Sequence, residues 1–544
     1  MKKTTFCLVL LFTILCFLQP GYAGSPLTLS SNGNGALLAM FSDTAREGSP
    51  LVRKAEGFSA TRGEILEAVY ELLGWGHELR VLPRICGEDP LFCLSSSVRP
   101  RPPEPFLESP QERATQEDIR LLLEWVSECR TSMVWNFSVE GKALHLRLHK
   151  EGIAAGSETW EVCLEKGLEE SAALEKLAGL SEAGWPAALR KAPDGLWDLI
   201  VGPYPSFLEA SRAFAALPRI PGMHMTPPPF LPASPPLFWA ALVSENGLLP
   251  EIRLASEIGK SRATLSELAQ AFEAEGGING GFFSGPVPIG TLVIHGILFH
   301  QSYGDRSAIG LAPDRAPVFG NGAVELEVET EKGTFRLDRL NERPRPGEIS
   351  FLFESRPFRD PAGLESEDVM EIPLDLELGE GGSNPPIPGL LAASGKTRDG
   401  LDSVKESRIR LQTAWSDRNF EGRDLVIQAG PAIVRNGQIN GEPESFSEDT
   451  RLGRHPRSMV GWDGSSLWWI VVDGRNPSHS MGLTLEEAAG LALSLGLADV
   501  LNLDGGGSSS LWWKDGLVSS PSGGSERPIP YAILFKTASG NVFK

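Results

Sequence analysis

Two short apolar runs near the C-terminus each end at an aspartate. Leu467 to Val472 stops at Asp473, and Val500 to Leu503 stops at Asp504. Apolar runs of this length that end at polar and glycine residues are typical of buried strands. The pattern therefore predicts two neighbouring strands, each with a carboxylate at its carboxyl end.

A helix is predicted between these two strands. Thr484 and Glu487 form a capping box, and Gly496 is typical of the residue after a helix, which we expect to end at about Leu495. A strand, a helix and a strand in this order form a right-handed parallel crossover, which brings both strand ends to one edge of a sheet. The two aspartates are then expected to face one crevice at that edge.

Residues 155–226 repeat a simpler pattern in two similar halves. We expect strands at 159–164, 185–190 and 196–201 and helices at 171–184 and 206–217. This order predicts a small βαββαβ module with one sheet and two helices. The fold class expected for the whole chain is α/β (α+β), in which a large mixed-sheet C-terminal domain carries the candidate site on its βαβ unit.

The remaining segments are a linker, an insertion and an N-terminal region. Residues 218–236 are a proline-dense linker, and residues 237–544 form the large domain. Within it, residues 360–402 are acidic and rich in glycine and proline, so we expect a surface excursion of low regularity. Residues 24–154 have no evident role: helices are predicted at 64–73 and 116–126, a strand at 144–148 and a proline-rich loop at 98–110.

The first residues have the pattern of a secretory signal. Lys2 and Lys3 precede an apolar run from Phe6 to Leu18, and small residues lead to Ala23. We expect a signal peptide at residues 1–23, because the run is short for a retained membrane anchor. A secreted or periplasmic location is expected, with no membrane span after cleavage.

The cysteine content and the net charge limit the redox state and the binding partners that we expect. An even number of cysteines follows the signal, in an oxidising compartment where disulfides are expected; they are Cys86, Cys93, Cys129 and Cys163. The pairing stays open, and a zinc site fits their spacing poorly. The formal net charge of −20 argues against nucleic acid as a partner.

Several polar and glycine-rich motifs lie at predicted strand ends. They are Asn279-Gly280-Gly281, Gly430 in QAGP, His455 and Arg457 in HPRS, Arg475 and Ser480 after Asp473, and Asp504 with Gly505, Gly506, Ser508 and Ser509. Taken singly, most of them are ordinary turn signals. Three glycines and three serines after Asp504 are more specific, because successive amides and hydroxyls form a nest that suits an oxyanion. A flexible Gly/Ser linker is the alternative, but apolar segments flank the run on both sides.

Taken together, the motifs resemble one family. NGGFF, QAGP, HPRS, VVDGR, S-x-G-x-T-x-x-E and LNLDGGGSSS occur here in the order seen in the phosphodiester glycosidases, over roughly residues 237–535. Ser458 stands where that family usually has threonine, and His295 departs from its usual turn residue. The stretch WDLIVGPYPSFLEASRAFAAL, at 197–217, resembles half of a SPOR domain, a module that binds peptidoglycan. A generic α/β module is the alternative for that stretch.

These resemblances imply an activity. The first implies hydrolysis of a sugar-1-phosphodiester similar to an N-acetylglucosamine-1-phosphodiester, in an envelope or exopolysaccharide substrate. Asp473, Asp504, Arg457 and Arg475 would be its catalytic residues. Asn279, Gly280, Gly281, Gly430, His455, Ser480, Gly505, Gly506, Ser508 and Ser509 would contact substrate. A carboxylate would activate water or attack the anomeric carbon, and arginines would grip the phosphate.

Other interpretations stay open. The chain fits a non-catalytic envelope protein that binds glycans, and it fits a glycosidase that acts on uncharged linkages. His224, His300 and His479 have no spacing typical of a metal site, so no cofactor is predicted. A divalent cation held by the aspartates is an unsupported alternative.

Overall fold

The computed structural model describes residues 61–536, apart from short gaps of which the longest are 154–159, 227–234, 359–368, 379–386 and 395–408. The predicted signal peptide lies outside the described residues. The chain divides into two compact units. Unit 1 contains Met1–Val139, Arg147–Trp239 and Asp473–Gly482, and unit 2 contains Glu140–Leu146, Ala240–Val472 and Leu483–Lys544. Each unit is described by itself.

Unit 1 begins with short helices. They are α4 (Arg62–Leu72), α5 (Gly76–Ile85), α6 (Pro90–Ser97) and α7 (Glu104–Glu108), followed by strands β1 (Val134–Val139) and β2 (Leu144–Glu151). Thr61 and Glu64 form a capping box that starts α4. Alternate residues of β2 are buried, as the apolar alternation predicts. Helix α7 corrects the expectation of a loop at 98–110, because Pro103 precedes the helix and Pro105 lies in its first turn, where proline is tolerated.

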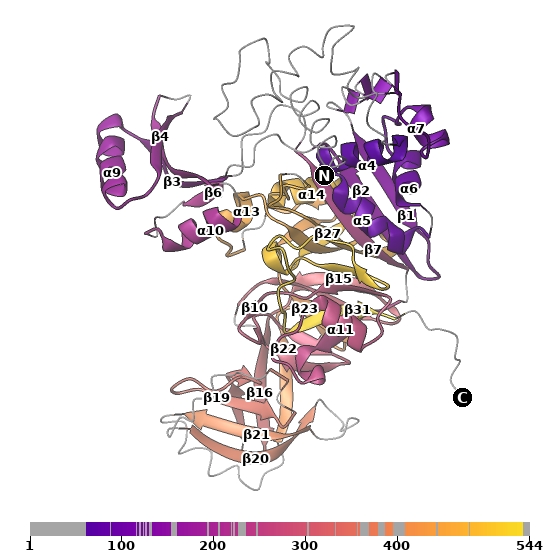
Figure 1. The fold of residues 1–544 in the computed structure, drawn as a ribbon. Coiled ribbons are helices and arrows are strands. Elements are labelled where there is room, and N and C mark those ends of the chain that lie inside the picture. The colour runs from indigo at the N-terminus through magenta and orange to yellow at the C-terminus, as the bar shows by residue number, and fades with distance from the viewer. Residues whose placement is uncertain are drawn as a thin grey trace. The chain divides into compact units, whose positions relative to one another are not determined.

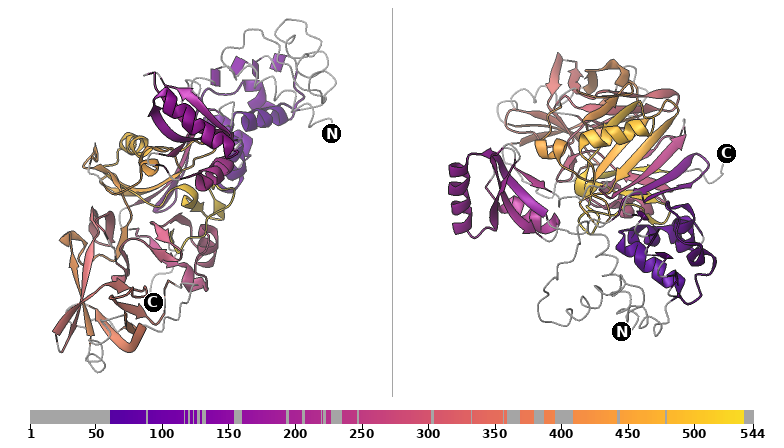
Figure 2. Two further views of the ribbon diagram at one scale, coloured as in Figure 1. Left: turned by 90° about the vertical axis from the view of Figure 1, so that its left-hand side faces the viewer. Right: turned by 90° about the horizontal axis from the view of Figure 1, so that it is seen from above.

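The βαββαβ module is confirmed in the second part of unit 1. Its elements are β3 (Trp160–Leu168), α9 (Glu170–Glu182), β4 (Ala187–Lys191), β5 (Trp197–Tyr204), α10 (Phe207–Ala216) and β6 (His224–Thr226). The strands form one sheet in the order β4-β5-β3-β6. The core of the module includes Val162, Leu199 and Val201 from the strands and Ala173 from α9. Both helices pack against this sheet, and Figure 2 shows the module from two further sides.

The largest sheet of unit 2 contains the two strands that were predicted from the apolar runs. They are β27 (Ser466–Val472) and β28 (Asp499–Asn502), with α14 (Leu485–Ser494) between them in the chain. The prediction that they are neighbours is wrong, because β26 (Arg457–Trp462) lies between them and pairs antiparallel with both. They are still parallel to each other, so both end at the edge where β26 begins.

Further strands of this sheet include a hairpin that was predicted from the sequence. Strand β7 (Leu237–Glu245) precedes β27 in the strand order, and β24 (Ala432–Arg435) and β25 (Gln438–Ile439) follow β28. Asn436 and Gly437 join β24 to β25 with φ of 49° and 72°. Two central residues with positive φ form a tight hairpin turn, as predicted from Asn-Gly.

Two five-stranded sheets surround the site segments of unit 2. The first has the order β30-β29-β9-β31-β8 and contains β8 (Glu251–Leu254), β9 (Gly276–Asn279), β29 (Leu511–Trp513), β30 (Gly516–Leu517) and β31 (Tyr531–Phe535). The second has the order β13-β12-β23-β14-β15 and contains β12 (Leu292–Ile294), β13 (Ile297–His300), β14 (Ser307–Ala312), β15 (Arg315–Asn321) and β23 (Leu425–Gln428). Smaller elements are η1 (Ala255–Ile258), α11 (Leu265–Ala271), β10 (Phe283–Ser284), β11 (Val287–Pro288), η4 (Arg418–Phe420), α13 (Glu448–Leu452) and η5 (Gly506–Ser508).

A seven-stranded sheet corrects the prediction of an irregular excursion at 360–402. Its order is β17-β16-β22-β20-β21-β19-β18, with β16 (Val324–Thr330), β17 (Gly333–Leu337), β18 (Arg339–Leu340), β19 (Ile349–Phe353), β20 (Val369–Leu378), β21 (Ile387–Ser394) and β22 (Ile409–Trp415). Strands β20 and β21 come from the supposed excursion and pair over eight residues. Ile372, Leu376 and Leu391 belong to the core of this sheet, so the described part of the segment is a core element of the sheet drawn in Figure 1.

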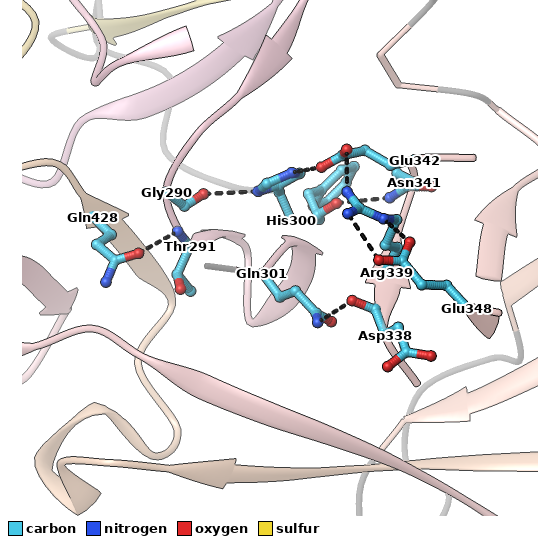
Figure 3. Close-up of polar contacts among 11 residues, drawn as sticks. Gly290, Thr291, His300, Gln301, Asp338, Arg339, Asn341, Glu342, Glu348 and Gln428 are labelled. Carbon is cyan, nitrogen blue, oxygen red and sulfur yellow. Dashed lines mark hydrogen bonds and ion pairs between the residues drawn. The ribbon is translucent and has the colours of Figure 1, made fainter. Parts of the chain in front are cut away.

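A polar network connects this sheet with the segment before β12. His300 is buried, and its ring nitrogens lie 3.0 Å from Gly290 O and 2.6 Å from Glu342 Oε1. Arg339 donates to Glu342 and to Glu348. Figure 3 shows the chain of contacts from Gly290 through His300 to Arg339. His300, predicted to lack metal-site spacing, thus has a role in packing.

The predicted disulfides are not confirmed. In the structure, Cys129 and Cys163 are free thiols. Cys129 and Cys163 are buried, and burial raises the pKa of the Cys163 thiol to about 11. The prediction came from the expected oxidising compartment and the even number of cysteines. Neither says whether two sulfur atoms lie close enough to bond. In the described residues, no helix is long and apolar enough to cross a membrane.

Candidate active site

The Asp504 loop, defined as residues 504–510, connects two sheets of unit 2. It leaves β28 and enters β29, which pairs with β9 so that Leu511 lies opposite Ile278. The Asp504 amide donates to Gly280 O over 3.3 Å, and the Asp504 side chain is half-buried. The loop therefore brings a carboxylate with partial solvent access beside the NGG motif.

Asn279 organises the loop. Its side chain is fully buried at the end of β9, and Nδ2 donates to Gly280 O and to Asp504 O over 3.0 and 2.7 Å. Its Oδ1 accepts from Ser458 Oγ at 2.8 Å and from the Ser510 amide at 3.2 Å. Both amide protons and both acceptor sites of Asn279 are thus used by protein groups. The residue predicted to bind substrate connects the NGG motif, the HPRS motif and the Asp504 loop.

The Ser458 hydroxyl has two acceptors within reach. Its Oγ can donate to Asn279 Oδ1 over 2.8 Å or to Ser509 Oγ over 3.1 Å. A hydroxyl carries one proton, so Ser458 makes one of these bonds at a time. Serine in place of the threonine usual in the resembling family therefore keeps the needed donor.

Tyr531 explains the glycines of NGG. A Cβ atom on Gly280 would lie 2.3 Å from the Tyr531 ring, so no side chain fits there. The Gly281 amide donates to the Tyr531 hydroxyl over 2.8 Å. Burial raises the pKa of Tyr531, and the nearby charge of Asp504 also raises it, while the Gly281 contact opposes the shift. Tyr531 is thus a neutral support under the Asp504 loop.

The loop differs from the predicted nest of open amides. The Gly506 amide donates to Pro456 O over 2.8 Å, and the Ser510 amide donates to Asn279. The amides of Ser508 and Ser509 donate to carbonyls within the loop. Since these four amides already have protein acceptors, they are not available to an oxyanion. Substrate binding by Gly505, Gly506, Ser508 and Ser509 stays a prediction.

Arg527 is the cation that sequence reasoning missed. It is exposed, and its Nη1 lies 3.3 Å from Ser508 Oγ. A Cβ on Gly507 would lie 2.6 Å from Arg527 Nη2, so the third glycine of the loop makes room for this guanidinium. Gly507 was the available signal: a run of three glycines allows another group to approach the backbone closely. Arg527 places a guanidinium directly beside the Asp504 loop.

Arg457 lies in a different environment. It is buried, its Nε donates to Leu483 O, and its Nη2 donates to the carbonyls of Thr450 and Gly453 over 2.8 to 2.9 Å. These contacts satisfy carbonyl groups at the C-terminal end of α13, where a cation is favourable. Arg457 therefore has a structural role, and its predicted grip on phosphate stays a prediction.

His455 and Gly430 also have structural contacts. His455 Nε2 lies 3.0 Å from Asp449 O. Gly430 exchanges hydrogen bonds with Asn502: its amide donates to Asn502 O, and Asn502 Nδ2 donates to Gly430 O, each over 3.0 Å. A Cβ on Gly430 would lie 2.3 Å from Glu444 Oε2, so this position requires glycine. The QAGP turn therefore holds the end of β28, two residues before Asp504.

Asp473 lies in unit 1, in a buried polar cluster. The residue is 1 % exposed, and its Oδ2 lies 2.9 Å from His479 Nε2. Ser480 Oγ donates to Asp473 O over 2.7 Å and accepts from the Phe238 amide. Ser480, predicted to bind substrate, is thus fully engaged in holding the backbone of Asp473.

Three further residues surround His479. Lys150 Nζ lies 3.2 Å from His479 Nδ1, Glu78 Oε1 lies 3.5 Å from the same nitrogen, and the His77 ring centroid lies 4.6 Å from that of His479. Burial lowers the pKa of His479 well below its usual value, and the charge of Lys150 adds to this effect. Burial raises the pKa of Glu78 and lowers that of Lys150. Sequence spacing gave no sign of this cluster, because Lys150, Glu78 and His77 lie hundreds of positions from His479.

Arg475 follows Asp473 in a strained conformation. Its φ is 62°, a region that residues with a side chain adopt only at a cost, and its amide donates to Met481 O over 3.2 Å. The side chain is half-buried. Strain of this kind is often found at functional positions, which agrees with the predicted role of Arg475 without testing it.

One group of side chains in the described residues has metal-ligand geometry. Ligand atoms of His77, Asp473 and His479 all lie within 4.8 Å of one another. Sequence spacing had suggested no metal site at His479. The nearby ammonium group of Lys150 opposes binding of a cation at this position.

The structure brings some predicted residues together and leaves others apart. Asn279, Gly280, Asp504 and Ser509 meet in unit 2. Asp473 and Ser480 lie together in unit 1. Because the two aspartates belong to different units, the expectation that they face one crevice stays a prediction.

Comparison with known proteins supports part of the resemblance. Residues 390–536 match the family model of the phosphodiester glycosidases. The matched segment contains Arg457, Asp473 and Asp504, whereas Asn279 and its two glycines precede it. No curated protein matches the chain.

Solved structures resemble the fold. A Burkholderia pseudomallei K96243 protein assigned as exported has a TM-score of 0.56 at 18 % identity, over 74 % of this chain and 96 % of its own. A hypothetical protein from Synechocystis has a TM-score of 0.45 at 15 % identity, over 74 % and 77 %. The catalytic domain of zebrafish N-acetylglucosamine-1-phosphodiester α-N-acetylglucosaminidase has a TM-score of 0.32 at 13 % identity, over 64 % and 81 %. The chain thus shares its fold with the Burkholderia protein, and its C-terminal part is similar in sequence to the phosphodiester glycosidases.

Proposed function

We propose that the chain is an exported hydrolase that cleaves the glycosidic bond of a sugar-1-phosphodiester. The observation that carries this proposal is the half-buried Asp504 on a loop anchored by Asn279, with the exposed guanidinium of Arg527 beside it. The family match over 390–536 supports the same reaction class. A substrate similar to an N-acetylglucosamine-1-phosphodiester in an envelope polymer or exopolysaccharide fits this combination of a carboxylate and a cation.

The chemistry of this substrate requires few groups. The leaving group is a phosphate monoester, already a weak base, so the enzyme gains little by protonating it. A carboxylate must activate water or attack the anomeric carbon, and a cation must stabilise the departing phosphate. Asp504 is suited to the first role because substrate can reach it. Arg527 is suited to the second, because a guanidinium binds phosphate bidentately.

The other predicted catalytic residues support this arrangement. Asp473 is the second carboxylate of the proposal, and its burial suits a positioning or electrostatic role better than contact with substrate. Arg475 is the second arginine that would meet phosphate. Arg457, with three carbonyl acceptors, would hold α13 beside the start of β26.

A direct assay tests the proposal. The full chain is incubated with UDP-N-acetylglucosamine and with a nitrophenyl sugar phosphodiester, and free sugar is measured. We expect release of sugar from both, with loss of activity in Asp504→Asn. Retention of the glycan without any product after long incubation would instead support a binding protein.

The module in unit 1 would bring the enzyme to its polymer. We propose that the βαββαβ module binds peptidoglycan, as its resemblance to a SPOR domain implies; its observed strand and helix order agrees with that resemblance. Sedimentation of the full chain with peptidoglycan, before and after amidase treatment, tests this role. We expect more protein in the pellet after amidase removes the stem peptides, and equal amounts would contradict it.

A further inference from the structure

Unit 1 contains a fully buried lysine whose three protons all have acceptors. Lys150, on β2, is 0 % exposed. Its Nζ donates to Gly74 O over 3.1 Å and to His479 O, and it lies 3.2 Å from His479 Nδ1. Its ammonium also lies 5.7 Å from the centroid of the Trp75 ring. An ammonium has three donors and no acceptor, so these contacts match its full capacity.

The position of Lys150 fixes the proton on His479. A protonated Lys150 has no acceptor, so in its contact with Nδ1 that nitrogen must be the acceptor of a neutral imidazole. The proton then lies on Nε2, which donates to Asp473 Oδ2 over 2.9 Å. The three groups form a directed chain in which Lys150 orients His479 and His479 orients the Asp473 carboxylate.

The charged groups around this chain are few. Glu78 Oε1 lies 3.8 Å from Lys150 Nζ and 3.5 Å from His479 Nδ1. Both carboxylate oxygens of Glu78 are buried without a hydrogen-bond partner in the described residues. His77 packs against the His479 ring, and Arg80 contributes a weaker charge. Lys150 interacts electrostatically with the buried Asp473, and a buried carboxylate requires a paired charge or hydrogen bonds.

The same geometry opposes a metal ion at His77, Asp473 and His479. A metal on His479 Nε2 would displace the proton that binds Asp473. The neutral imidazole would then carry its proton on Nδ1. That proton would point at the ammonium group of Lys150, which has no acceptor. A carboxylate or carbonyl normally occupies the position that Lys150 takes here.

We infer that Lys150 and His479 are positioning residues for Asp473, so that the N-terminal region, for which the sequence gave no role, supplies part of the surroundings of Asp473. This inference rests on the proposed function, and it deepens that function by assigning a task to the N-terminal region. Lys150 acts through His479 and does not contact substrate.

Steady-state kinetics on the full chain test the chain of contacts. We expect Lys150→Met to lower kcat roughly 10- to 100-fold with KM nearly unchanged, since partners that orient a reacting group have effects of this size. His479→Gln keeps a donor toward Asp473 and should retain more activity than His479→Leu. Lys176→Met, at an exposed lysine of the same unit, is the matched control and should act like wild type.

A double-mutant cycle separates positioning from general damage. In an Asp473→Asn background, Lys150→Met should have little further effect on kcat, because the group that it positions is already altered. An equal loss in both backgrounds would overturn the inference. Full activity of Lys150→Met in the wild-type background would overturn it as well.

A spectroscopic measurement keeps the inference independent of the activity. Nitrogen-15 NMR of histidine-labelled wild-type protein should give a neutral His479 with its proton on Nε2, assigned by comparison with His479→Gln. If the protein hydrolyses no phosphodiester, the proposed function fails, and this spectrum alone decides the inference. A proton on Nδ1, or a His479 signal that shifts on addition of zinc, would overturn it.

Discussion

Asp473 and Asp504 follow similar strands, yet their surroundings differ in almost every physical respect. Asp504 is half-buried on a loop of glycines and serines and has an exposed arginine beside that loop. Asp473 is 1 % exposed and receives a hydrogen bond from a buried histidine, which a buried lysine holds in turn. Two carboxylates in different environments can have different tasks. Under the proposed function, Asp504 would contact substrate, and Asp473 would give orientation or electrostatic support.

The largest expected effect distinguishes these two tasks. Asp504→Asn removes the carboxylate that meets substrate, so we expect kcat to fall roughly 10²- to 10⁴-fold, the usual range for a general base. Asp473→Asn should lower kcat less, because it leaves the reacting group in place. Parallel assays of both variants on one nitrophenyl sugar phosphodiester measure the difference. A larger loss for Asp473→Asn would reverse the assignment.

A smaller effect is expected at Arg527. Arg527→Ala removes the guanidinium beside Ser508, so kcat/KM for a sugar phosphodiester should fall by about 10-fold, equivalent to about 1.4 kcal/mol of transition-state stabilisation. Arg527→Lys should recover part of the loss, since it keeps the charge but not the bidentate geometry. Exposed Arg418, which is remote in sequence from the loop, supplies a control substitution to alanine. Equal activity of Arg527→Ala and wild type would remove Arg527 from the proposal.

The glycine beneath Asp504 offers a test of stability. Gly280→Ala would place a Cβ atom 2.3 Å from the Tyr531 ring, and overpacking of this kind costs about 1–3 kcal/mol. Gly490→Ala, in the exposed interior of α14 with open space around it, should instead stabilise by about 0.5–1 kcal/mol. Urea unfolding of both variants measures the change in the free energy of unfolding, which should fall for Gly280→Ala and rise for Gly490→Ala. A neutral Gly280→Ala would mean that Tyr531 does not pack on the NGG motif as described.

The smallest effect is expected from reduction. Cys129 and Cys163 are free thiols of unit 1, so a reducing agent should leave the melting temperature unchanged. Alkylation of the denatured protein without reductant should label both. A melting temperature that falls on reduction would show that disulfides form and stabilise unit 1.

Local sequence patterns predicted helices and strands well where the hydrophobic period and the capping or turn residues indicate the same element. The capping box at Thr484 and Glu487, the Asn-Gly turn and the βαββαβ order of the module all appear as expected. The segment 369–378 also alternates, with Ile372 and Leu376 on one face, and it forms β20. Its overall acidity and its flanking glycines and prolines had obscured this alternation, which the period alone would have identified.

Long-range arrangements could not be predicted from the same patterns. The position of β26 between β27 and β28 depends on strand pairing, which no local period encodes. The contact of Lys150 with His479 joins residues 329 positions apart. The motif at Asn279 was recognised as part of a site, but its saturation by Ser458, Ser510 and backbone carbonyls required coordinates.

The position of bond cleavage tests the central claim most directly. Hydrolysis of a sugar-1-phosphodiester in ¹⁸O-labelled water distinguishes attack at the anomeric carbon from attack at phosphorus. For wild-type protein with UDP-N-acetylglucosamine, we predict that mass spectrometry will find ¹⁸O in the released sugar and none in the phosphate. Label in the phosphate would identify a phosphodiesterase and contradict the account, and so would the absence of any labelled product.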